Sequence, residues 1–330
     1  MGLTVAVTGP TGTFGYGLMP LLEADERVER VVGIARRPFD PAQEGWTKLA
    51  YRQGDVRDRA ALEHAFEGAD VVVHLAFMVT GTGAGREAIR AINVGGTRNA
   101  FAAAADAGVA RFVYASSVAA YGFHPDNPIG MTEEWPVRRA AHLFYAQEKA
   151  EIEQLLAEEA ALHPELGVYV LRPPVVLGPH SVGAKTLLPG PLAPVARALA
   201  AAAARLPVAL PAIVPPLPLQ FVHEHDVGEA LVRCIAGAGP PGAYNIAGDG
   251  VLTAVEVARV LGLAVLPAPR RPVQAAGRLL AALPFAPPAA EWAEAMSHPA
   301  IMDTGKARRE LGWRPRYSAL EALRDTLGKR

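Results

Sequence analysis

The chain has 330 residues, with 32 Lys and Arg against 33 Asp and Glu and a formal net charge of −1. This balance leaves no basic excess to neutralise a row of phosphates, so nucleic acids and anionic membrane surfaces are excluded as expected partners. Hydrophobic residues make up 51% of the sequence, which suffices for a large core and excludes a disordered chain.

Several features indicate a reducing compartment. The single cysteine, Cys234, has no second cysteine for an internal disulfide, and no Cys and His spacing indicates a zinc site. The N-terminus runs directly into a strand pattern without the regions of a signal peptide. Arginines and prolines interrupt the apolar stretch 187–219, which argues against a membrane span. We therefore expect a cytoplasmic protein with a core cysteine, no metal and no membrane partner.

Short β-rich runs alternate with Ala-rich helical stretches through the first half of the chain. The candidate strands are nearly continuous apolar runs at 4–7, 31–34, 71–75, 111–115 and 168–171. Helical spacing occupies 14–26, 57–67, 86–107 and 140–162. This alternation predicts an α/β fold with a Rossmann-type, doubly wound parallel sheet, because strands that are apolar throughout are buried on both faces.

The pattern loosens after residue 173 into Pro-rich segments, and helical spacing returns from residue 253 and at the C-terminus. We therefore expect two interleaved lobes. The dinucleotide-binding lobe comprises 1–175 and takes in 220–250. A smaller, mixed substrate-binding lobe comprises 176–219 and 251–330.

The first predicted strand ends in a glycine-rich loop, and a helical pattern follows at once. Glycines at such spacing permit a tight turn, close approach of the backbone to a diphosphate and close packing of helix on strand. The helix N-terminus adds N–H groups and the positive end of the helix dipole. An ordinary turn is the alternative. We expect a dinucleotide to be held here by Gly9, Thr11, Gly12, Thr13, Phe14 and Gly15.

The end of the second strand indicates which dinucleotide is bound. NAD-specific sites carry an acidic side chain there for the adenosine ribose, whereas this chain has Arg36 and Arg37. Guanidinium groups suit a 2′-phosphate, so NADP is favoured over NAD, with a solvated charged loop as the alternative. Asp55 and Val56 follow the third strand, where a carboxylate can accept the adenine amino group. Asp55 could equally cap the helix expected from residue 57.

A series of further motifs runs along the chain in a fixed order. They are His74-Leu75-Ala76, Asn93-Val94-Gly95-Gly96-Thr97, Ser116-Ser117 with Tyr121-Gly122, Tyr145-Ala146-Gln147-Glu148-Lys149, Leu171-Arg172-Pro173-Pro174 with Gly178-Pro179, Phe221-Val222-His223 with Asp226-Val227, and Leu311-Gly312-Trp313 with Pro315. With the glycine loop, they give residues 4–315 the order of the extended short-chain dehydrogenase/reductases. The chain resembles the NAD-dependent epimerase/dehydratase family.

The resemblance implies a nicotinamide cofactor, a small-molecule substrate and a homodimer formed through a four-helix bundle. The dimer helices would be 86–107 and 140–162. Their apolar positions Ile89, Ile92, Phe101, Ile152 and Leu155 suit that interface, although they could equally face the sheet. The family motifs also imply cofactor contacts from Leu75, Ala76, Asn93 and Pro173, although helix packing alone would explain Asn93.

A Ser, Tyr and Lys set carries the expected chemistry. Tyr145 and Lys149 are four residues apart on a predicted helix and therefore lie on one face. The ammonium group is expected to lower the phenol pKa from about 10, which makes Tyr145 the acid/base. Ser117 can hold the substrate oxygen while hydride moves between nicotinamide and carbon. In relatives the lysine also touches the nicotinamide ribose. A surface pair on a solvated helix is the alternative.

Two departures from relatives narrow the reaction. Sugar-nucleotide 4,6-dehydratases have Asp and Glu after the active-site Ser or Thr, whereas this chain has Val118 and Ala119. Without those carboxylates, we expect neither a dehydratase nor a decarboxylase. Leu219 replaces the arginine that UDP-sugar epimerases aim at the substrate diphosphate. The candidate replacements for that arginine are Arg197, Arg205, Arg233 and the pair Arg270 and Arg271.

The expected function is an NAD(P)-dependent oxidoreductase that acts on a secondary alcohol or ketone of a small, partly apolar or sugar-like substrate. A sugar or nucleotide-sugar 4-epimerase and a non-catalytic NADP(H)-binding sensor are the alternatives. A sensor would usually lack the Tyr or the Lys. Structural roles are favoured for His142, His223 and His225, and Arg172 is expected either at the cofactor or in a structural hydrogen-bond network.

Overall fold

The computed structural model describes residues 2–79, 85–181, 211–214, 216–267, 292 and 298–328. Seven strands form one parallel sheet in the order β11-β6-β5-β4-β1-β2-β3. The strand order reverses between β1 and β4, the position at which Rossmann folds bind dinucleotides. The predicted fold class is confirmed. The strands are β1 Leu3–Thr8, β2 Val28–Ala35, β3 Leu49–Gln53, β4 Val71–His74, β5 Arg111–Ala115, β6 Gly167–Arg172 and β11 Gly242–Asn245.

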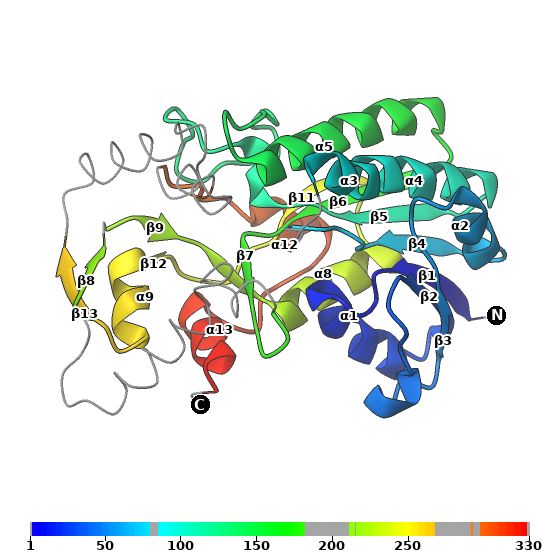
Figure 1. Cartoon of the computed structure of the whole chain (residues 1–330), viewed down its shortest axis with the longest axis horizontal. Coiled ribbons are helices and arrows are strands. Elements are labelled where there is room, and N and C mark those ends of the chain that lie inside the picture. The colour runs from blue at the N-terminus through cyan, green and yellow to red at the C-terminus, as the bar shows by residue number, and fades with distance from the viewer. Residues whose placement is uncertain are drawn as a thin grey trace.

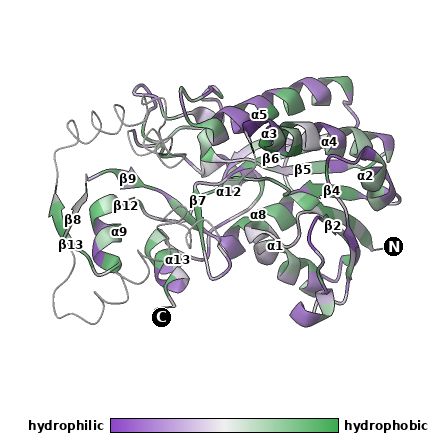
Figure 2. Ribbon diagram, in the orientation of Figure 1, coloured by the Kyte–Doolittle hydropathy of each residue, from purple (hydrophilic) through white to green (hydrophobic). Residues whose placement is uncertain are grey.

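Helices cover both faces of this sheet (Figure 1). Helices α1 (Thr13–Ala24) and α8 (Glu224–Ile235) pack on one face, where their apolar residues share a core cluster with β1. The other face carries α2 (Arg59–Phe66), α4 (Gly96–Asp106) and α5 (Phe144–Leu162). Along α4 and α5, hydrophobic and hydrophilic residues alternate in Figure 2, as expected of helices with one face on a sheet.

Helices α1 and α8 cross at two glycines. A Cβ atom on Gly228 would lie 2.1 Å from the carbonyl oxygen of Gly17, so the backbones are in direct contact. This crossing brings the N-terminal end of α8 against the helix that follows the glycine loop. The Rossmann lobe therefore includes residues from far along the chain.

The predicted helix 86–107 is wrong as one continuous element. It consists of α3 (Arg86–Arg90), a π-helical turn (Ala91–Gly95) and α4. In this wider turn Asn93 points inward, and the Thr97 hydroxyl donates to the Asn93 carbonyl at 2.6 Å. Turns of this kind recur at functional sites in helices. Two helix starts also differ: α2 begins at Arg59 rather than 57, and α5 at Phe144 rather than 140.

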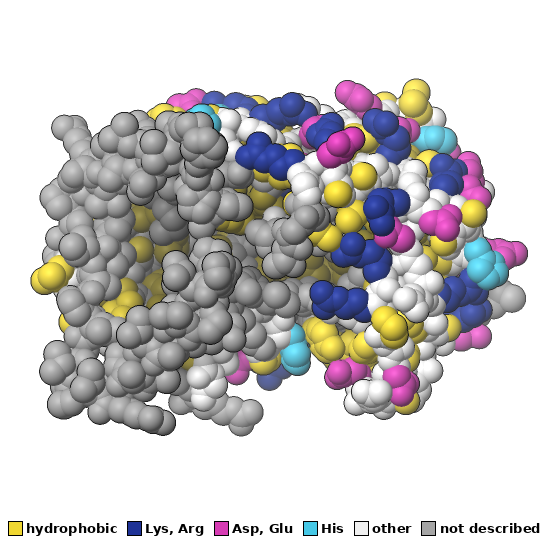
Figure 3. All heavy atoms as spheres, viewed as in Figure 1, with side chains coloured by type: hydrophobic (Ala, Val, Ile, Leu, Met, Phe, Trp, Pro, Cys, Tyr) yellow, Lys and Arg dark blue, Asp and Glu magenta, His cyan; other side chains and the backbone are white. Residues whose placement is uncertain are grey.

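The apolar positions expected at the dimer interface are buried within the single chain. Ile92, Phe101, Ile152 and Leu155 belong to the core cluster between the helices and the sheet, and Ile89 is 8% exposed. These residues therefore pack toward the sheet and not toward a dimer interface. The outer surface seen in Figure 3 carries interspersed basic and acidic side chains over the Rossmann lobe.

The second lobe is mixed, and most of its strands lie at the end of the molecule opposite the N-terminus (Figure 1). Three two-stranded pairs and three helices make up its described part, and one strand of these pairs, at 221–223, comes from the 220–250 segment that was expected in the Rossmann lobe. No helix in the described ranges is both long and apolar enough for a membrane span. The pairs are β7 (Val175–Leu177) with β10 (Phe221–His223), β9 (Pro218–Leu219) with β12 (Leu252–Thr253) and β8 (Pro211–Val214) with β13 (Ala264–Pro267); the helices are α9 (Ala254–Val260), α12 (Gly305–Glu310) and α13 (Ala319–Thr326).

Candidate active site

The glycine loop between β1 and α1 has the shape that a diphosphate requires. Gly9 has a φ of 72°, a backbone conformation that favours glycine. A Cβ on Gly15 would lie 1.9 Å from the carbonyl oxygen of Pro10, so this position accepts only glycine. At Gly12 the nearest atom to a Cβ is 3.4 Å away, which leaves the backbone at the start of α1 open. The loop therefore fits a bound dinucleotide.

A buried histidine fixes the loop against β4. His74 Nδ1 lies 2.8 Å from Thr8 Oγ1, and its Nε2 lies 3.0 Å from Thr97 Oγ1. Because Thr97 gives its proton to the Asn93 carbonyl, His74 donates from Nε2 and accepts at Nδ1. Burial lowers the pKa of His74 to about 3, so the ring is neutral. The N–H groups of Leu75 and Ala76 both donate to Thr8 Oγ1 at 3.2 Å, which holds these two predicted residues beside Gly9.

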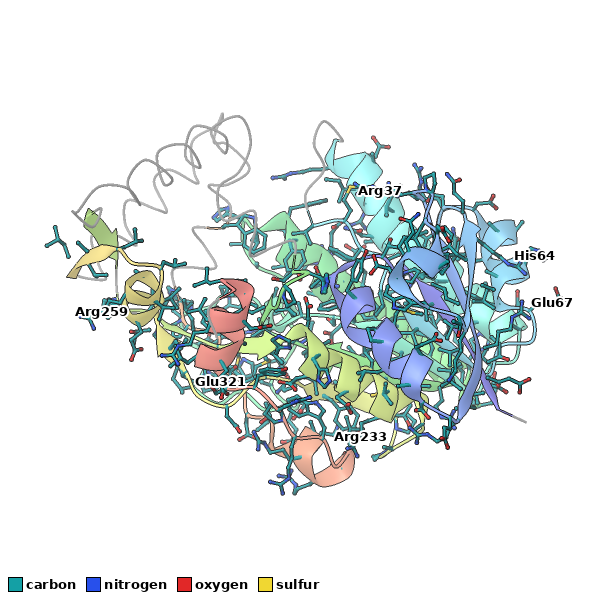
Figure 4. The ribbon with its side chains drawn as sticks, turned by 90° about the horizontal axis from the view of Figure 1, so that it is seen from below. Arg37, His64, Glu67, Arg233, Arg259 and Glu321 are labelled. Carbon is teal, nitrogen blue, oxygen red and sulfur yellow. The ribbon has the colours of Figure 1, made fainter. Side chains whose placement is uncertain are left out.

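The side chains of Arg36 and Arg37 are exposed where β2 ends, and Figure 4 labels Arg37 there. Their carbonyls accept hydrogen bonds from Gln53 and Tyr51 of β3, so the backbone is held while both guanidinium groups face solvent. This arrangement suits contact with a phosphate at the adenosine end of the crevice.

The structure rejects one of the two roles considered for Asp55. Asp58, not Asp55, caps α2 by accepting from the Ala61 N–H at 3.2 Å. Asp55 instead pairs with Arg57, and the hydrogen bond from Arg57 lowers the pKa of its carboxyl. Val56 is buried against α4, because a Cβ on Gly96 would lie 2.4 Å from its Cγ2. These loops bring the ends of β2 and β3 to one edge of the crevice.

Ser117 and Tyr145 meet at the carboxyl end of β5. Ser117 caps the short helix Val118–Tyr121 by accepting from the Ala119 N–H at 3.2 Å, and its side chain hydrogen-bonds the Tyr145 hydroxyl. Burial raises the pKa of Tyr145, and the hydrogen bond with Ser117 partly offsets this effect. At neutral pH, Tyr145 therefore carries its proton.

Lys149 is buried one helical turn further along α5 and is directed toward β5. Its Nζ donates to the Tyr114 hydroxyl at 3.0 Å and to the Ala115 carbonyl at 2.8 Å, and it lies 3.8 Å from the centre of the Phe77 ring. Burial lowers the pKa of Lys149 to about 7. The expected lowering of the Tyr145 pKa by Lys149 is wrong for this structure, because the ammonium binds β5 and lies 6.0 Å from the Tyr145 ring centre.

Asn93 lies behind this set and binds protein groups. Its Oδ1 accepts from the Met78 N–H at 2.8 Å, and its Nδ2 donates to the Met78 carbonyl at 2.9 Å and to Glu148 Oε2 at 2.7 Å. Glu148, which is 1% exposed, was not among the predicted site residues. Its place inside the motif, directly before Lys149, was the available signal.

A second buried network supports the same strand ends. Arg172 binds Glu153 through Nε at 3.0 and 3.1 Å and through Nη2 at 2.5 Å, and Ser116 donates to that carboxylate. Arg172 also donates to the Tyr121 hydroxyl at 2.7 Å. Of its two expected roles, Arg172 therefore has the structural one. The Pro173 carbonyl accepts from the Val118 N–H at 2.9 Å, which places Pro173 beside the Ser117 turn.

His223, His225 and the cysteine have structural positions. His223 caps α8 by accepting from the His225 N–H at 3.1 Å, and its Nε2 lies 3.1 Å from Asp325. His225 contacts the edge of the Tyr317 ring, and His142 is exposed. Cys234 is fully buried in the core on the α1 and α8 side of the sheet, as predicted.

The three positions at which this chain departs from its relatives, Leu219, Val118 and Ala119, are packed among apolar residues or buried. Leu219 packs on the cluster of Leu177, Phe221, Ala319, Ala322 and Leu323. Val118 and Ala119 are 8% and 2% exposed. Arg233 lies in the last turn of α8, at the far end of the helix from His223, and Figure 4 shows it beside α12. It is therefore too distant to replace the missing arginine, and Arg197, Arg205, Arg270 and Arg271 lie outside the described residues.

A glycine loop at the switch point of a parallel sheet, with Ser, Tyr and Lys at the adjacent strand end, defines the class of Rossmann-fold oxidoreductases. The chain belongs to the NAD dependent epimerase/dehydratase family, whose family model matches residues 5–247. This finding confirms the resemblance inferred from the motifs.

Two curated relatives show what the sequence is similar to. An uncharacterised protein of Mycobacterium tuberculosis is 28% identical over 326 residues, which cover 97% of this chain and 82% of that protein. Sterol demethylase protein B of Methylococcus capsulatus is 33% identical over 178 residues, which cover 54% of this chain and 52% of that protein.

Two solved structures share the fold across nearly the whole chain. The dTDP-glucose 4,6-dehydratase of Streptomyces venezuelae with NAD and TYD bound has a TM-score of 0.71 at 24% identity and covers 99% of this chain and 96% of its own. The UDP-glucose 4-epimerase of Thermotoga maritima with UDP-glucose has a TM-score of 0.73 at 18% identity and covers 99% and 98%. At these identities the likeness shows the fold alone.

Proposed function

We propose that the chain is an NAD(P)-dependent oxidoreductase that acts on a secondary alcohol or ketone of a small, partly apolar or sugar-like substrate. The observation that carries this proposal is the hydrogen-bonded pair of Ser117 and Tyr145, beside buried Lys149 at the crevice that the glycine loop opens. When bound there, the nicotinamide supplies or accepts hydride at the substrate carbon.

The three side chains divide the remaining work. Ser117 donates a hydrogen bond to the substrate oxygen and orients it. Tyr145, whose pKa is raised by burial, gives its proton to that oxygen as a ketone is reduced and takes it back in the reverse direction. Lys149 would hold the nicotinamide ribose. Among its present partners the Phe77 ring face is the weakest, so that contact is the one to be exchanged.

The cofactor proposed is NADP rather than NAD. Arg36 and Arg37 are exposed at the end of β2, at the position where NAD-specific sites carry a carboxylate. Gly9, Thr11, Gly12, Thr13, Phe14 and Gly15 would hold the diphosphate, and Asp55, Val56, Leu75, Ala76, Asn93 and Pro173 would line the crevice.

Elimination chemistry is not part of the proposal. Dehydratases are among the structures of the same fold, so the fold itself permits that reaction. Val118 and Ala119, however, put buried apolar side chains where a dehydratase needs its two carboxylates. A 4-epimerase remains the second candidate, because it needs only Tyr145 and a retained cofactor.

Three further proposals come from sequence. The lobe boundaries are 1–175 with 220–250, and 176–219 with 251–330. A homodimer would use the outer surfaces of α3, α4 and α5, since their inner apolar faces already pack on the sheet. The single cysteine favours the cytoplasm.

Oxidation of NADPH and NADH with a panel of ketones, aldehydes and keto-sugars tests the reaction. We expect NADPH-dependent turnover with ketones that is lost in Tyr145→Phe. Mass spectrometry of the denatured supernatant separates the candidates, because an epimerase retains its nucleotide through each cycle. Nucleotide binding without turnover of any panel member would support the sensor, and unchanged turnover in Tyr145→Phe would refute the catalytic assignment.

A further inference from the structure

Tyr145 lies between two aromatic rings that come from distant parts of the chain. The Phe77 ring meets it edge-on, with centres 5.5 Å apart and an interplanar angle of 87°. The Trp292 ring stacks on it, with centres 5.6 Å apart and an angle of 29°. Phe77 follows β4, whereas Trp292 belongs to the C-terminal section. We call Phe77, Tyr145 and Trp292 the aromatic clamp.

The Phe77 side of the clamp is held rigidly. The next residue, Met78, has both its backbone N–H and its carbonyl bound by Asn93, at 2.8 and 2.9 Å. Glu148 fixes the Asn93 amide from α5 at 2.7 Å. An Asn side chain that binds both polar groups of one residue sets the path of that backbone. The position of the Phe77 ring is therefore built into the π-helical turn and α5.

Among the described residues, small apolar side chains also pack on Tyr145, alongside Ser117 and Lys149. Tyr145 packs with Phe123 on a cluster of Ala119, Ala140, Leu143 and Ala146. Its pKa responds to burial and to the hydrogen bond with Ser117, as expected where hydroxyl groups provide the polarity. Trp292 is 38% exposed, so part of its ring remains open to a ligand.

These surroundings favour one kind of ligand. Lys149 lies 3.8 Å from the Phe77 ring, but its Nζ is already bound by Tyr114 and Ala115, so an anionic group would lose its hydration here at a cost that these bonds leave uncompensated. A flat apolar ring, by contrast, gains contact area against aromatic faces and edges. Its alcohol or ketone oxygen would meet Ser117 and Tyr145. The name of the relative sterol demethylase protein B is consistent with an apolar ring substrate.

We propose that the aromatic clamp is a substrate subsite for an uncharged, flat apolar ring that carries the reacting alcohol or ketone. This inference rests on the proposed function and narrows its substrate class. It assigns Trp292 as a specificity-determining residue, which contacts the ring and takes no part in proton transfer.

Binding of 2-tetralone, a fused-ring ketone, to the full-length protein with NADP⁺ tests the proposal without requiring turnover. Hydroxyacetone, a small polar ketone, is the comparison probe, and calorimetry measures both dissociation constants. We expect Trp292→Ala to weaken 2-tetralone binding about tenfold while hydroxyacetone changes less than about twofold. Trp292→Phe, which keeps an aromatic ring, should restore most of the affinity.

Trp135→Phe is the matched control, because Trp135 bonds Asn127 and lies outside the clamp. It should leave both probes unchanged. Equal weakening of both probes by Trp292→Ala, no weakening, or no binding of 2-tetralone to the native chain would each overturn the proposal. Clamp-dependent binding without oxidation of NADPH by any ketone would refute the proposed reaction while the subsite stands, so the two failures are distinguishable.

Discussion

The two sides of Tyr145 are built on opposite principles. On the sheet side, buried polar groups of the strands are matched by partners on neighbouring strands and helices: His74 by Thr8 and Thr97, and Arg172 by Glu153. On the other side, Phe77, Trp292 and small apolar residues surround the hydroxyl pair. A buried polar group without a partner is costly, so the first side is rigid and specific. The second leaves recognition to shape and to the two hydroxyls.

The largest predicted effect is on kcat and comes from removing the Tyr145 hydroxyl, which lies between the polar and the apolar side. Tyr145→Phe removes the proton donor but keeps the ring and its aromatic contacts. We expect kcat to fall by about 10²–10⁴, the contribution of a positioned acid/base. NADPH binding should stay within about twofold of the native value, since the cradle is untouched. Steady-state kinetics and nucleotide titration measure the two quantities, and a parallel loss of binding would contradict the separation of roles.

On the polar side, the next largest effect belongs to the buried ion pair. Arg172→Ala leaves Glu153 charged and buried, and we expect the free energy of unfolding to fall by about 3–5 kcal/mol. Arg27→Ala is the matched control, because the Arg27 side chain is 61% exposed and its pair with Asp25 contributes about 0–1 kcal/mol. Urea unfolding of both variants makes the comparison. Similar losses in the two would show that burial does not distinguish these pairs.

The lowered pKa of Lys149 predicts that the free energy of unfolding depends on pH. Burial lowers its pKa in the folded chain to about 7 from 10.5, so between these values the unfolded chain binds more protons. The contribution of Lys149 therefore makes the free energy of unfolding rise with pH across that window. Lys149→Met has no such titration and should flatten the curve relative to the native chain. Urea unfolding from neutral to alkaline pH gives both slopes, and identical slopes would contradict a lowered pKa.

The smallest predicted effect concerns cofactor choice at the edge of the polar side. Arg36→Ala removes a guanidinium from the end of β2, and we expect NADPH binding to weaken about tenfold, as for loss of one charge-assisted contact. NADH binding should be unaffected. Arg30→Ala is the control, because Arg30 is exposed toward the opposite end of the same strand. Fluorescence titration measures the affinity of each variant for NADPH and NADH. Equal weakening of both affinities in Arg36→Ala would contradict a contact between Arg36 and the 2′-phosphate.

The sequence predicted the polar side better than the apolar side, for physical reasons. Strands buried on both faces are apolar throughout, and a glycine loop follows local backbone rules, so both can be recognised from short segments. The π-helical turn could not be foreseen, because Asn93 is drawn inward by Met78 and by Glu148, which is 55 residues away. The direction of Lys149 likewise depends on Tyr114 and Ala115 of another strand.

The aromatic clamp was also beyond sequence reasoning. Neither Phe77 nor Trp292 lies at a spacing that relates it to Tyr145, and only the fold brings the three rings together. Asp55 illustrates the same limit on a smaller scale. Both Asp55 and Asp58 precede α2, and the choice of cap was settled by the start of the helix at Arg59.

The most direct test of Tyr145 as the proton donor in hydride transfer follows a deuterium atom from the cofactor to the product. NADPH deuterated at the nicotinamide C4 is supplied with the ketone of the panel that reacts fastest, and mass spectrometry measures label at the new carbinol carbon. The account predicts label in the product of the native chain and a rate at least about 100-fold lower in Tyr145→Phe. Equal labelling rates in the two proteins would contradict the assignment of Tyr145 as the proton donor at the boundary of the two sides.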